Sequence, residues 1–319
     1  MQDFYKKIQI VNNLLPIVRP RPFNTLLKRF VIKFLQNYVF RHPISAAWPK
    51  RSHGSKVLQL RIDTPLGTRG TLIKIPEDKN MYLQICRTGS WETDQSVWLA
   101  QVLDSIDHLP GKKVLLDIGA NVGLISRQVA NLSRSDFDLF LVEPRPVNVL
   151  ACKFNFENVR KSVKYFEVGL STSSQKTDLF VEETNQGNAS IHRIAMPTGG
   201  GIWTTESITL VSTKEFFETL LENYSHIIIK CDTQGNDAEI ISSIPKRFWE
   251  RIHGIVFECW SLENIDSDQV DRVIKFLRSF NFINFRGVPN SEEALNDLKK
   301  FFLSNSQETT YFYACRSEI

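Results

Sequence analysis

Short apolar segments alternate with segments of helical spacing through most of the second half of the chain. Runs such as 114–117 and 227–231 are almost wholly apolar and rich in Val, Leu and Ile, which is typical of strands covered on both faces. An alternation of such strands with helices predicts a parallel sheet with helices on both sides. The predicted strands are 114–117, 139–143, 164–168, 227–232, 254–258, 281–285 and 310–315.

One segment, residues 171–212, interrupts this alternation. Residues 179–181 and 208–211 have the pattern of strands in a hairpin-like excursion, and a polar, glycine-bearing loop is expected over 185–201 between them. Loops of this length inside a compact domain usually carry function or lack order. The strands of the sheet resume after a helix predicted over 213–222.

The segment before the sheet divides into three parts. A basic amphipathic helix is predicted over 24–40, followed by a linker over 41–56 that contains Pro, Ser, Lys and Arg. Three short strands, 57–62, 70–75 and 81–86, predict a small antiparallel cap, and a helix runs from about residue 89 to 106. We therefore expect a helical extension over 1–56 and one domain over 57–319, with the cap over 57–87 and a Rossmann-like core over 88–319.

The first strand of the core leads into a glycine turn with candidate chemistry. Asp117 stands at the strand end, and Gly119 and Gly123 follow in the spacing G-x-x-x-G. Glycine permits a tight turn and a close approach of the backbone, and the next helix offers unpaired N–H groups. The G-x-G-x-x-G pattern of dinucleotide sites is absent.

This spacing suits S-adenosylmethionine (SAM), which has no pyrophosphate to be cradled by a middle glycine. Its carboxylate could meet the turn amides, and its ammonium could meet Asp117 directly or through water. Glu143 ends the second strand twenty residues after Gly123, where a ribose-binding carboxylate belongs in a Rossmann-like unit. The candidate cofactor-binding residues are Asp117, Gly119, Ala120, Asn121, Val122, Gly123, Glu143, Pro144, Val168 and Gly169.

Acids also end two later strands, at Asp232 and Glu258. Because open α/β sheets bind ligands beyond the carboxyl ends of their strands, these acids are expected at the same rim as Asp117 and Glu143. Asp232 is the candidate catalytic residue, as a base or as an orienting acid for a hydroxyl acceptor. It could instead cap the helix predicted over 236–243. No metal-ligand spacing is present, although Asp232 and Asp237 could share a divalent cation.

Five segments together resemble the FkbM family of SAM-dependent methyltransferases. They are residues 117–123, 142–144, 188–190, 230–235 and 257–258, and the match covers roughly 88–260. The resemblance implies the seven-stranded class I methyltransferase sheet with an antiparallel last strand. It also implies O-methylation, often of sugar hydroxyls in glycans or natural products, and places 185–190 on the substrate side. One departure is Asp237, where the family usually has Glu.

Basic residues are concentrated in the first 60 residues of the chain. Residues 1–60 carry 11 of the 39 Lys and Arg but one of the 35 acids, so their net charge is +10 and that of the remainder is −6. A basic surface around the active site is therefore not predicted, which argues against a nucleic-acid acceptor. The helix over 24–40 could lie on an anionic membrane surface, or pack on the domain or in a homodimer.

No signal peptide and no run of about 18 apolar residues is recognised, and the five cysteines lack zinc or disulfide spacing. These features predict a cytoplasmic protein, with peripheral contact at the inner membrane face as an option. The expected function is SAM-dependent methylation of a hydroxyl of a sugar in a glycan, lipid-linked saccharide or glycosylated natural product. The alternatives are methylation of another nucleophile, such as a protein or small-molecule amine, and a non-catalytic SAM-fold binding module.

Overall fold

A computed structural model describes most of the chain from residue 57 onward. The described residues are 57–62, 71–76, 81, 84–85, 88–182, 185–192, 203–261, 266–288, 291–304, 306 and 308–317. The predicted extension over 1–56, including the basic helix over 24–40, lies outside them. In the described part of the chain, no helix has the length and apolar character needed to cross a membrane.

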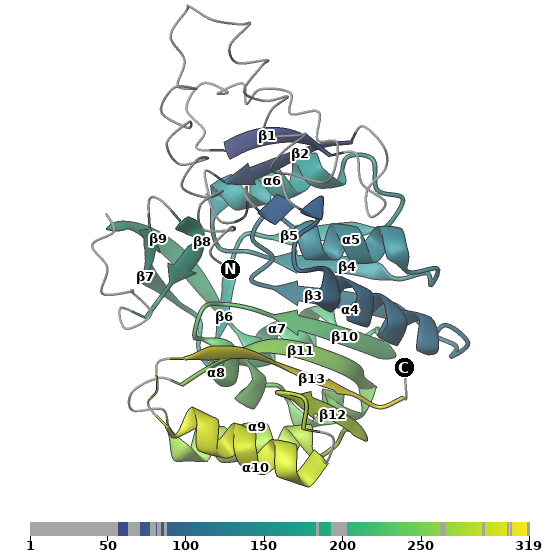
Figure 1. The fold of residues 1–319 in the computed structure, drawn as a ribbon, viewed down its shortest axis with the longest axis vertical. Helices are drawn as coiled ribbons and strands as arrows, with labels where there is room; N and C mark the ends of the chain where they lie inside the picture. The colour runs from purple at the N-terminus through teal and green to yellow at the C-terminus, as the bar shows by residue number, and fades with distance from the viewer. Residues whose placement is uncertain are drawn as a thin grey trace, which may run out of the picture.

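The centre of the molecule is a seven-stranded sheet (Figure 1). Its strand order is β12-β13-β11-β10-β3-β4-β5. The pairs among β5, β4, β3, β10 and β11 are parallel, whereas β13 runs antiparallel to both β11 and β12. This arrangement confirms the predicted mostly parallel sheet with an antiparallel last strand. The strands are β3 (Lys113–Ile118), β4 (Asp138–Val142), β5 (Val163–Phe166), β10 (His226–Cys231), β11 (Ile252–Trp260), β12 (Phe282–Phe285) and β13 (Thr309–Cys315).

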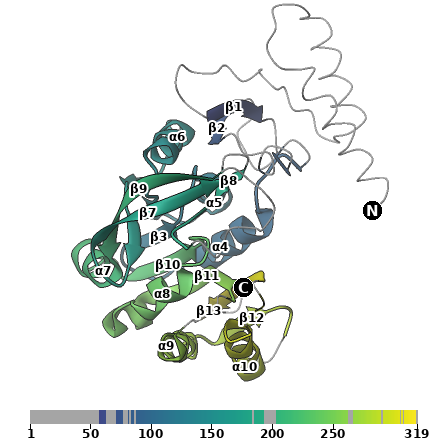
Figure 2. The ribbon, with the colours of Figure 1, turned by 90° about the vertical axis from the view of Figure 1, so that its left-hand side faces the viewer.

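Alternate side chains of each central strand face two different helical layers. Leu115 packs with α4 (Thr93–Ser105), α5 (Leu124–Leu132) and α6 (Pro146–Phe156), whereas Val114 and Leu116 pack with α7 (Thr213–Leu220), α8 (Asp237–Ser242) and α9 (Ser267–Leu277). Figure 2 shows α4 and α8 on opposite sides of β10. The near-continuous apolar runs of the sequence are therefore explained by burial on both faces.

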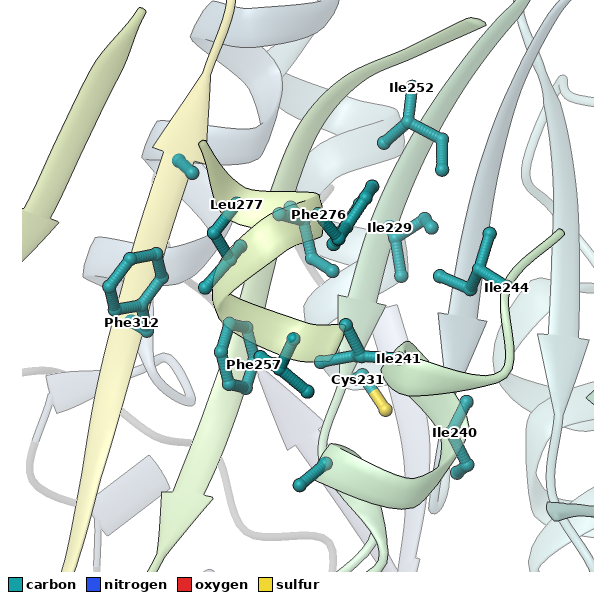
Figure 3. Packing of buried hydrophobic residues seen from close by; sticks show 14 of the residues in the cluster. Ile229, Cys231, Ile240, Ile241, Ile244, Ile252, Phe257, Phe276, Leu277 and Phe312 are labelled. Carbon is teal, nitrogen blue, oxygen red and sulfur yellow. The ribbon is translucent and has the colours of Figure 1, made fainter. Parts of the chain in front are cut away.

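The layer that contains α8 and α9 closes tightly over β10, β11 and β13. Ile241 and Phe276 lie over Ile229, Cys231 and Phe257 (Figure 3). Burying a side chain such as Phe276 stabilises the fold by about 1.5–3 kcal/mol. This packing anchors β10 and β11, near whose carboxyl ends Asp232 and Glu258 lie, and of these two acids Asp232 is the candidate catalytic residue.

Two elements in the last third have no counterpart in the sequence prediction. They are the 3₁₀ helix η4 (Lys246–Arg251) and the helix α10 (Ser291–Phe302). Helix α10 buries Leu295, Leu298 and Phe302 against the core, at the helical spacing that marks an amphipathic helix. The sheet predicted over 281–285 and 310–315 is confirmed as β12 and β13.

A second sheet is built from residues 169–212, which include the interruption predicted over 171–212. Its strand order is β6-β9-β7-β8, and the strands are β6 (Gly169–Ser171), β7 (Gln175–Glu182), β8 (Asn185–Ser190) and β9 (Trp203–Ser212). The loop predicted from residue 185 was wrong at its start, because Asn185–Ser190 pair with β7 as an edge strand. Pairing with a neighbouring strand overrides the weak strand propensity of this polar segment.

The N-terminal cap is a hairpin of β1 (Val57–Ile62) and β2 (Thr71–Pro76). It is joined to α6 through Asn155, whose Oδ1 accepts from the Lys74 N–H at 2.6 Å and whose Nδ2 donates to the Lys74 carbonyl at 2.8 Å. The third strand predicted over 81–86 was wrong: the described residues there, Met81, Gln84 and Ile85, are helical. Met81 and Ile85 are buried against the cap and the first turn of α5, so tertiary packing explains the apolar spacing.

Candidate active site

A cavity of about 310 Å³ opens at the carboxyl ends of β3, β4, β10 and β11. This is the edge at which open α/β sheets bind ligands, and the volume is within the range of small-molecule sites. Elements on several sides of this edge form its wall, including the segment before α4, the glycine turn, the second sheet and β13. Of the predicted site residues, the cavity is lined by Gly119, Ala120, Asn121, Val122, Glu143, Pro144, Gly169 and Asp232.

The glycine turn is shaped by contact with β10. Gly119 has a φ of +71°, and a Cβ at this position would lie 1.9 Å from the carbonyl oxygen of Asp232. Gly123 has a φ of +74°, and a Cβ there would lie 2.7 Å from the ring of Phe156 in α6. Both glycines are therefore required by the protein's own packing, since any side chain would displace a neighbouring element.

Several amides of this turn are bonded inside the protein. The N–H groups of Gly119 and Ala120 both donate to the carbonyl of Val142, at 2.9 and 3.0 Å. The Asn121 N–H donates to Glu143 Oε2 at 2.9 Å, and the Gly123 N–H donates to the Ala120 carbonyl at 2.7 Å. The expectation that turn amides meet a ligand carboxylate therefore does not hold for these four N–H groups.

Asp117 lies behind the cavity wall. Its side chain is 1% exposed, Oδ2 accepts from Ser126 Oγ at 2.6 Å, and Oδ1 lies 3.1 Å from Lys230 Nζ. The same ammonium donates to the Gly119 carbonyl at 2.7 Å. Such a buried pair with additional hydrogen bonds holds β3, β10 and the turn together. Asp117 is not among the residues that line the cavity, and neither are Gly123 and Val168.

Glu143 closes the β4 end of the cavity. Oε1 accepts from the Arg145 N–H at 3.0 Å and from Asn148 Nδ2 at 3.2 Å, and Oε2 accepts from the Asn121 N–H. Burial raises the pKa of Glu143 to about 7, although these donors oppose the shift. Three donors therefore orient a carboxyl group that exchanges its proton near neutral pH.

A network of side chains forms the opposite end of the cavity. Asp232 Oδ2 accepts from the Tyr311 hydroxyl at 3.2 Å, and the same hydroxyl lies 3.4 Å from Glu92 Oε1. Gln234 Nε2 bridges Asp232 Oδ1 and Glu258 Oε2, at 2.8 and 2.9 Å. The side chain of Asp232 thus lies between two other carboxyl groups and is oriented by two neutral donors.

Burial and like charge perturb the groups around Asp232. They raise the pKa of Glu258 to about 10, so this carboxyl group is neutral at pH 7, and it also accepts from Trp260 Nε1 at 2.7 Å. Burial and the neighbouring Asp232 raise the pKa of Asp237 to about 6. A cleft with several perturbed acids is a strong candidate for a functional site.

The alternative role of Asp232 as a helix cap is not observed. Asn236 is the N-cap of α8, and the Asp237 carboxylate accepts from the N–H groups of Thr233 and Gly235, at 3.2 and 3.4 Å. Within the described residues, no group of three or more His, Cys, Asp and Glu side chains is arranged to hold a metal ion.

His192 and His253, the histidines that could serve as bases by residue type alone, are not among the residues that line the cavity. His253 pairs with His226 at 2.9 Å, near the amino end of β11, and is thus at the opposite edge of the sheet. The pattern of the sequence did not single out Glu92 or Tyr311. Glu92 was read only as part of a helix start, and Tyr311 reaches the site through the antiparallel pairing that sets it opposite Glu258.

The strand order and the acid-lined cavity at the carboxyl edge define the class I SAM-dependent methyltransferase fold. No family model matches the chain. One curated relative is the methyltransferase sdnD of Sordaria araneosa, which is 23% identical over 185 residues, covering 50% of this chain and 71% of the relative. With the fold, this similarity supports a SAM-dependent methyltransferase.

Two solved structures illustrate the likeness at the level of the fold. A SAM-dependent methyltransferase from Agrobacterium tumefaciens has a TM-score of 0.38 and 9% identity, over 85% of this chain and 73% of that chain. A SAM-dependent O-methyltransferase from Thermotoga maritima has a TM-score of 0.33 and 13% identity, over 82% and 79%. At these scores, the assignment of the fold rests on the strand order of this chain.

Proposed function

We propose that this protein is a SAM-dependent O-methyltransferase of the FkbM type, acting on a hydroxyl of a sugar in a glycan, a lipid-linked saccharide or a glycosylated natural product. The observation that carries the proposal is the placement of Asp232. It lines the cavity at the end of β10, and both of its oxygens are oriented by side-chain donors. The motifs shared with the FkbM family support the acceptor class.

The residues of the cavity suit the parts of SAM. Near Glu143, the wall includes apolar side chains that could cover an adenine ring: Leu170, Leu179, Ile208 and Leu210. The carboxylate of Glu143 is a suitable acceptor for ribose hydroxyls. At the other end, Glu92 and Asp232 offer carboxyl groups to a ligand that carries positive charge, while Lys230 is paired with Asp117.

Some buried polar atoms of the cavity wall also have no hydrogen-bond partner in the described part of the chain. Asn121 Oδ1, Asn148 Oδ1 and Arg145 Nη1 belong to lining residues, are buried, and have no hydrogen-bond partner within the protein. Buried polar atoms are rarely left unpaired, so such atoms in a cavity wall indicate a polar ligand. These two acceptors and one donor, together with the carboxyl groups of Glu92 and Asp232, therefore fit a nucleoside with a cationic tail.

Bound SAM supplies an electrophilic methyl group, whose bond to sulfur breaks as the bond to the acceptor oxygen forms, and the acceptor hydroxyl releases a proton. Asp232 is placed to accept this proton, because its carboxylate faces the cavity. Tyr311 and Gln234 fix its orientation, and general-base assistance of this kind contributes about 10²–10⁴-fold. Because Glu258 is neutral at pH 7, Asp232 has no second full negative charge on that side.

The experiment that tests the proposal uses SAM with a deuterated methyl group and a panel of free sugars, nucleotide sugars, glycans and amines. We expect a product heavier by one labelled methyl group on a hydroxylated acceptor, stable to acid and alkali as an ether is. Labelled product only on amines would overturn O-methylation. A protein that binds SAM but labels no acceptor would favour the non-catalytic module.

We also propose, from the charge of residues 1–60, that the segment 24–40 contacts an anionic membrane surface on the cytoplasmic side. These residues lie outside the described part of the chain. The expected result is salt-sensitive pelleting with anionic liposomes that is lost when residues 1–50 are deleted. Equal pelleting of both proteins would contradict this proposal and would favour packing within the domain or in a homodimer.

A further inference from the structure

Glu92 is a carboxyl group in the cavity wall for which the proposed chemistry names no specific partner on the ligand. It immediately precedes α4 with a φ of +44°, an uncommon conformation for a residue other than glycine. Gln95 Nε2 donates to its Oε2 at 2.8 Å, and Tyr311 approaches its Oε1 at 3.4 Å. The side chain is thus held at the end of the cavity that Asp232 also lines.

Asp117, the acid that the sequence assigns to the ammonium of SAM, is already bonded to other side chains of the protein. Asp117 is bonded to Ser126 and paired with Lys230, and it lies behind the glycine turn. Freeing it for a ligand would leave the ammonium of Lys230 buried with a single carbonyl partner, and removing one partner of a buried pair is strongly destabilising. A contact between Asp117 and the ligand is therefore disfavoured.

At this end of the cavity, the single ammonium of Lys230 faces three carboxyl groups, those of Asp117, Asp232 and Glu92, so negative groups outnumber positive ones. The carboxyl groups of Glu92 and Asp232 share the hydroxyl of Tyr311, and burial together with Asp232 raises the pKa of Glu92 to about 7. A cation placed beside Glu92 would offset both the burial and the repulsion. SAM carries an ammonium on its methionine part as well as the sulfonium.

We infer that Glu92 binds the ammonium group of the methionine part of SAM, in the role that the sequence assigns to Asp117. This inference rests on the proposed function, because it places the cofactor in the cavity. Asp232 then remains available to the acceptor, and the two carboxyl groups have separate roles: one holds the donor and the other serves the acceptor.

The test compares two neutral thioethers, S-adenosylhomocysteine and methylthioadenosine, by isothermal titration. Methylthioadenosine lacks the amino-acid part but keeps the nucleoside. We expect Glu92→Gln to weaken binding of S-adenosylhomocysteine by about 10- to 100-fold, as loss of a hydrogen bond to a charged group implies. Binding of methylthioadenosine should change less than about twofold. Asp94→Asn, an exposed acid in the first turn of α4, is the matched control and should bind both ligands normally.

A second variant separates charge from size. Glu92→Asp keeps the charge on a shorter side chain, and we expect a smaller loss for S-adenosylhomocysteine than in Glu92→Gln. Equal losses of both ligands in Glu92→Gln, or unchanged binding of S-adenosylhomocysteine, would overturn the assignment. So would equal losses in the two variants. A folded wild-type protein that binds neither ligand would instead refute the proposed function, and the assignment with it.

Discussion

The two ends of the cavity hold their carboxyl groups by different means. Glu143 accepts from two backbone N–H groups, those of Asn121 and Arg145, and from one side-chain amide. Asp232 and Glu258 accept from side chains at the opposite end. Backbone donors are fixed by the fold, whereas side-chain donors depend on the rotamers of their own side chains. Under the proposed function, the Glu143 end holds the nucleoside of SAM, and at the opposite end Glu92 holds its methionine part while Asp232 serves the acceptor.

The largest effect is expected from Asp232→Asn. The amide keeps the size of the side chain but cannot accept the proton, so we expect methyl transfer to fall by about 10²–10⁴-fold. Binding of SAM should change less than about threefold, because Glu143 and Glu92, the two proposed contacts of SAM, are intact. Single-turnover transfer of a labelled methyl group, with titration of SAM into the same protein, measures both quantities. Unchanged turnover would remove Asp232 from the chemistry and leave the fold assignment untouched.

A change at the other end should affect binding rather than turnover. In Glu143→Gln the amide nitrogen faces N–H donors, so one carboxylate acceptor is lost, and we expect SAM to bind about 10- to 100-fold more weakly. Glu157→Gln, an exposed acid at the end of α6, is the matched control. Equal affinities of the two variants, measured by isothermal titration, would exclude a role of Glu143 in binding.

The pH dependence of methylthioadenosine binding tests the role of Glu143 separately from that of Asp232. Ribose hydroxyls donate to the ionised form of Glu143, whose pKa burial raises to about 7. Binding is therefore expected to tighten as the pH rises from 6 to 8, by up to about tenfold. The dependence should be reduced in Glu143→Gln. Isothermal titration at four pH values measures this dependence. An affinity of the wild-type protein for methylthioadenosine that does not change with pH would contradict this account.

The smallest effect concerns stability. The unfolded chain loses the Glu258 proton near its ordinary pKa of 4.5, whereas the folded protein retains it to about 10. The folded state therefore binds more protons between these values, so this group makes the stability fall as the pH rises. Glu258→Gln should show a shallower fall between pH 5 and 8 in urea unfolding. An unchanged slope would mean that Glu258 ionises normally.

The sequence predicted the parts of the molecule that are local in the chain. The buried strands, the glycine turn and the acid at the end of β4 were all placed correctly, because each is encoded within a few residues. The strand predicted over 81–86 failed, since burial of Met81 and Ile85 against the cap produces apolar spacing without a strand. The polar segment 185–190 became a strand through its pairing with β7.

The site was predicted less completely than the fold. The glycine turn and Asp117 were predicted to contact the ligand, whereas Asp117 and the four turn amides described above are bonded within the protein. Glu92 and Tyr311 reach the cavity from segments more than 200 residues apart, at 3.4 Å from each other. No local pattern encodes such a contact, because it depends on the insertion of β13 beside β11.

The most direct test of the central claim is equilibrium dialysis of the wild-type protein with methyl-labelled SAM. If the cavity at the carboxyl edge of the sheet is a SAM site, one SAM should bind per chain, saturably, and S-adenosylhomocysteine should displace it. Absence of saturable binding to a protein whose circular dichroism shows it to be folded would contradict the account.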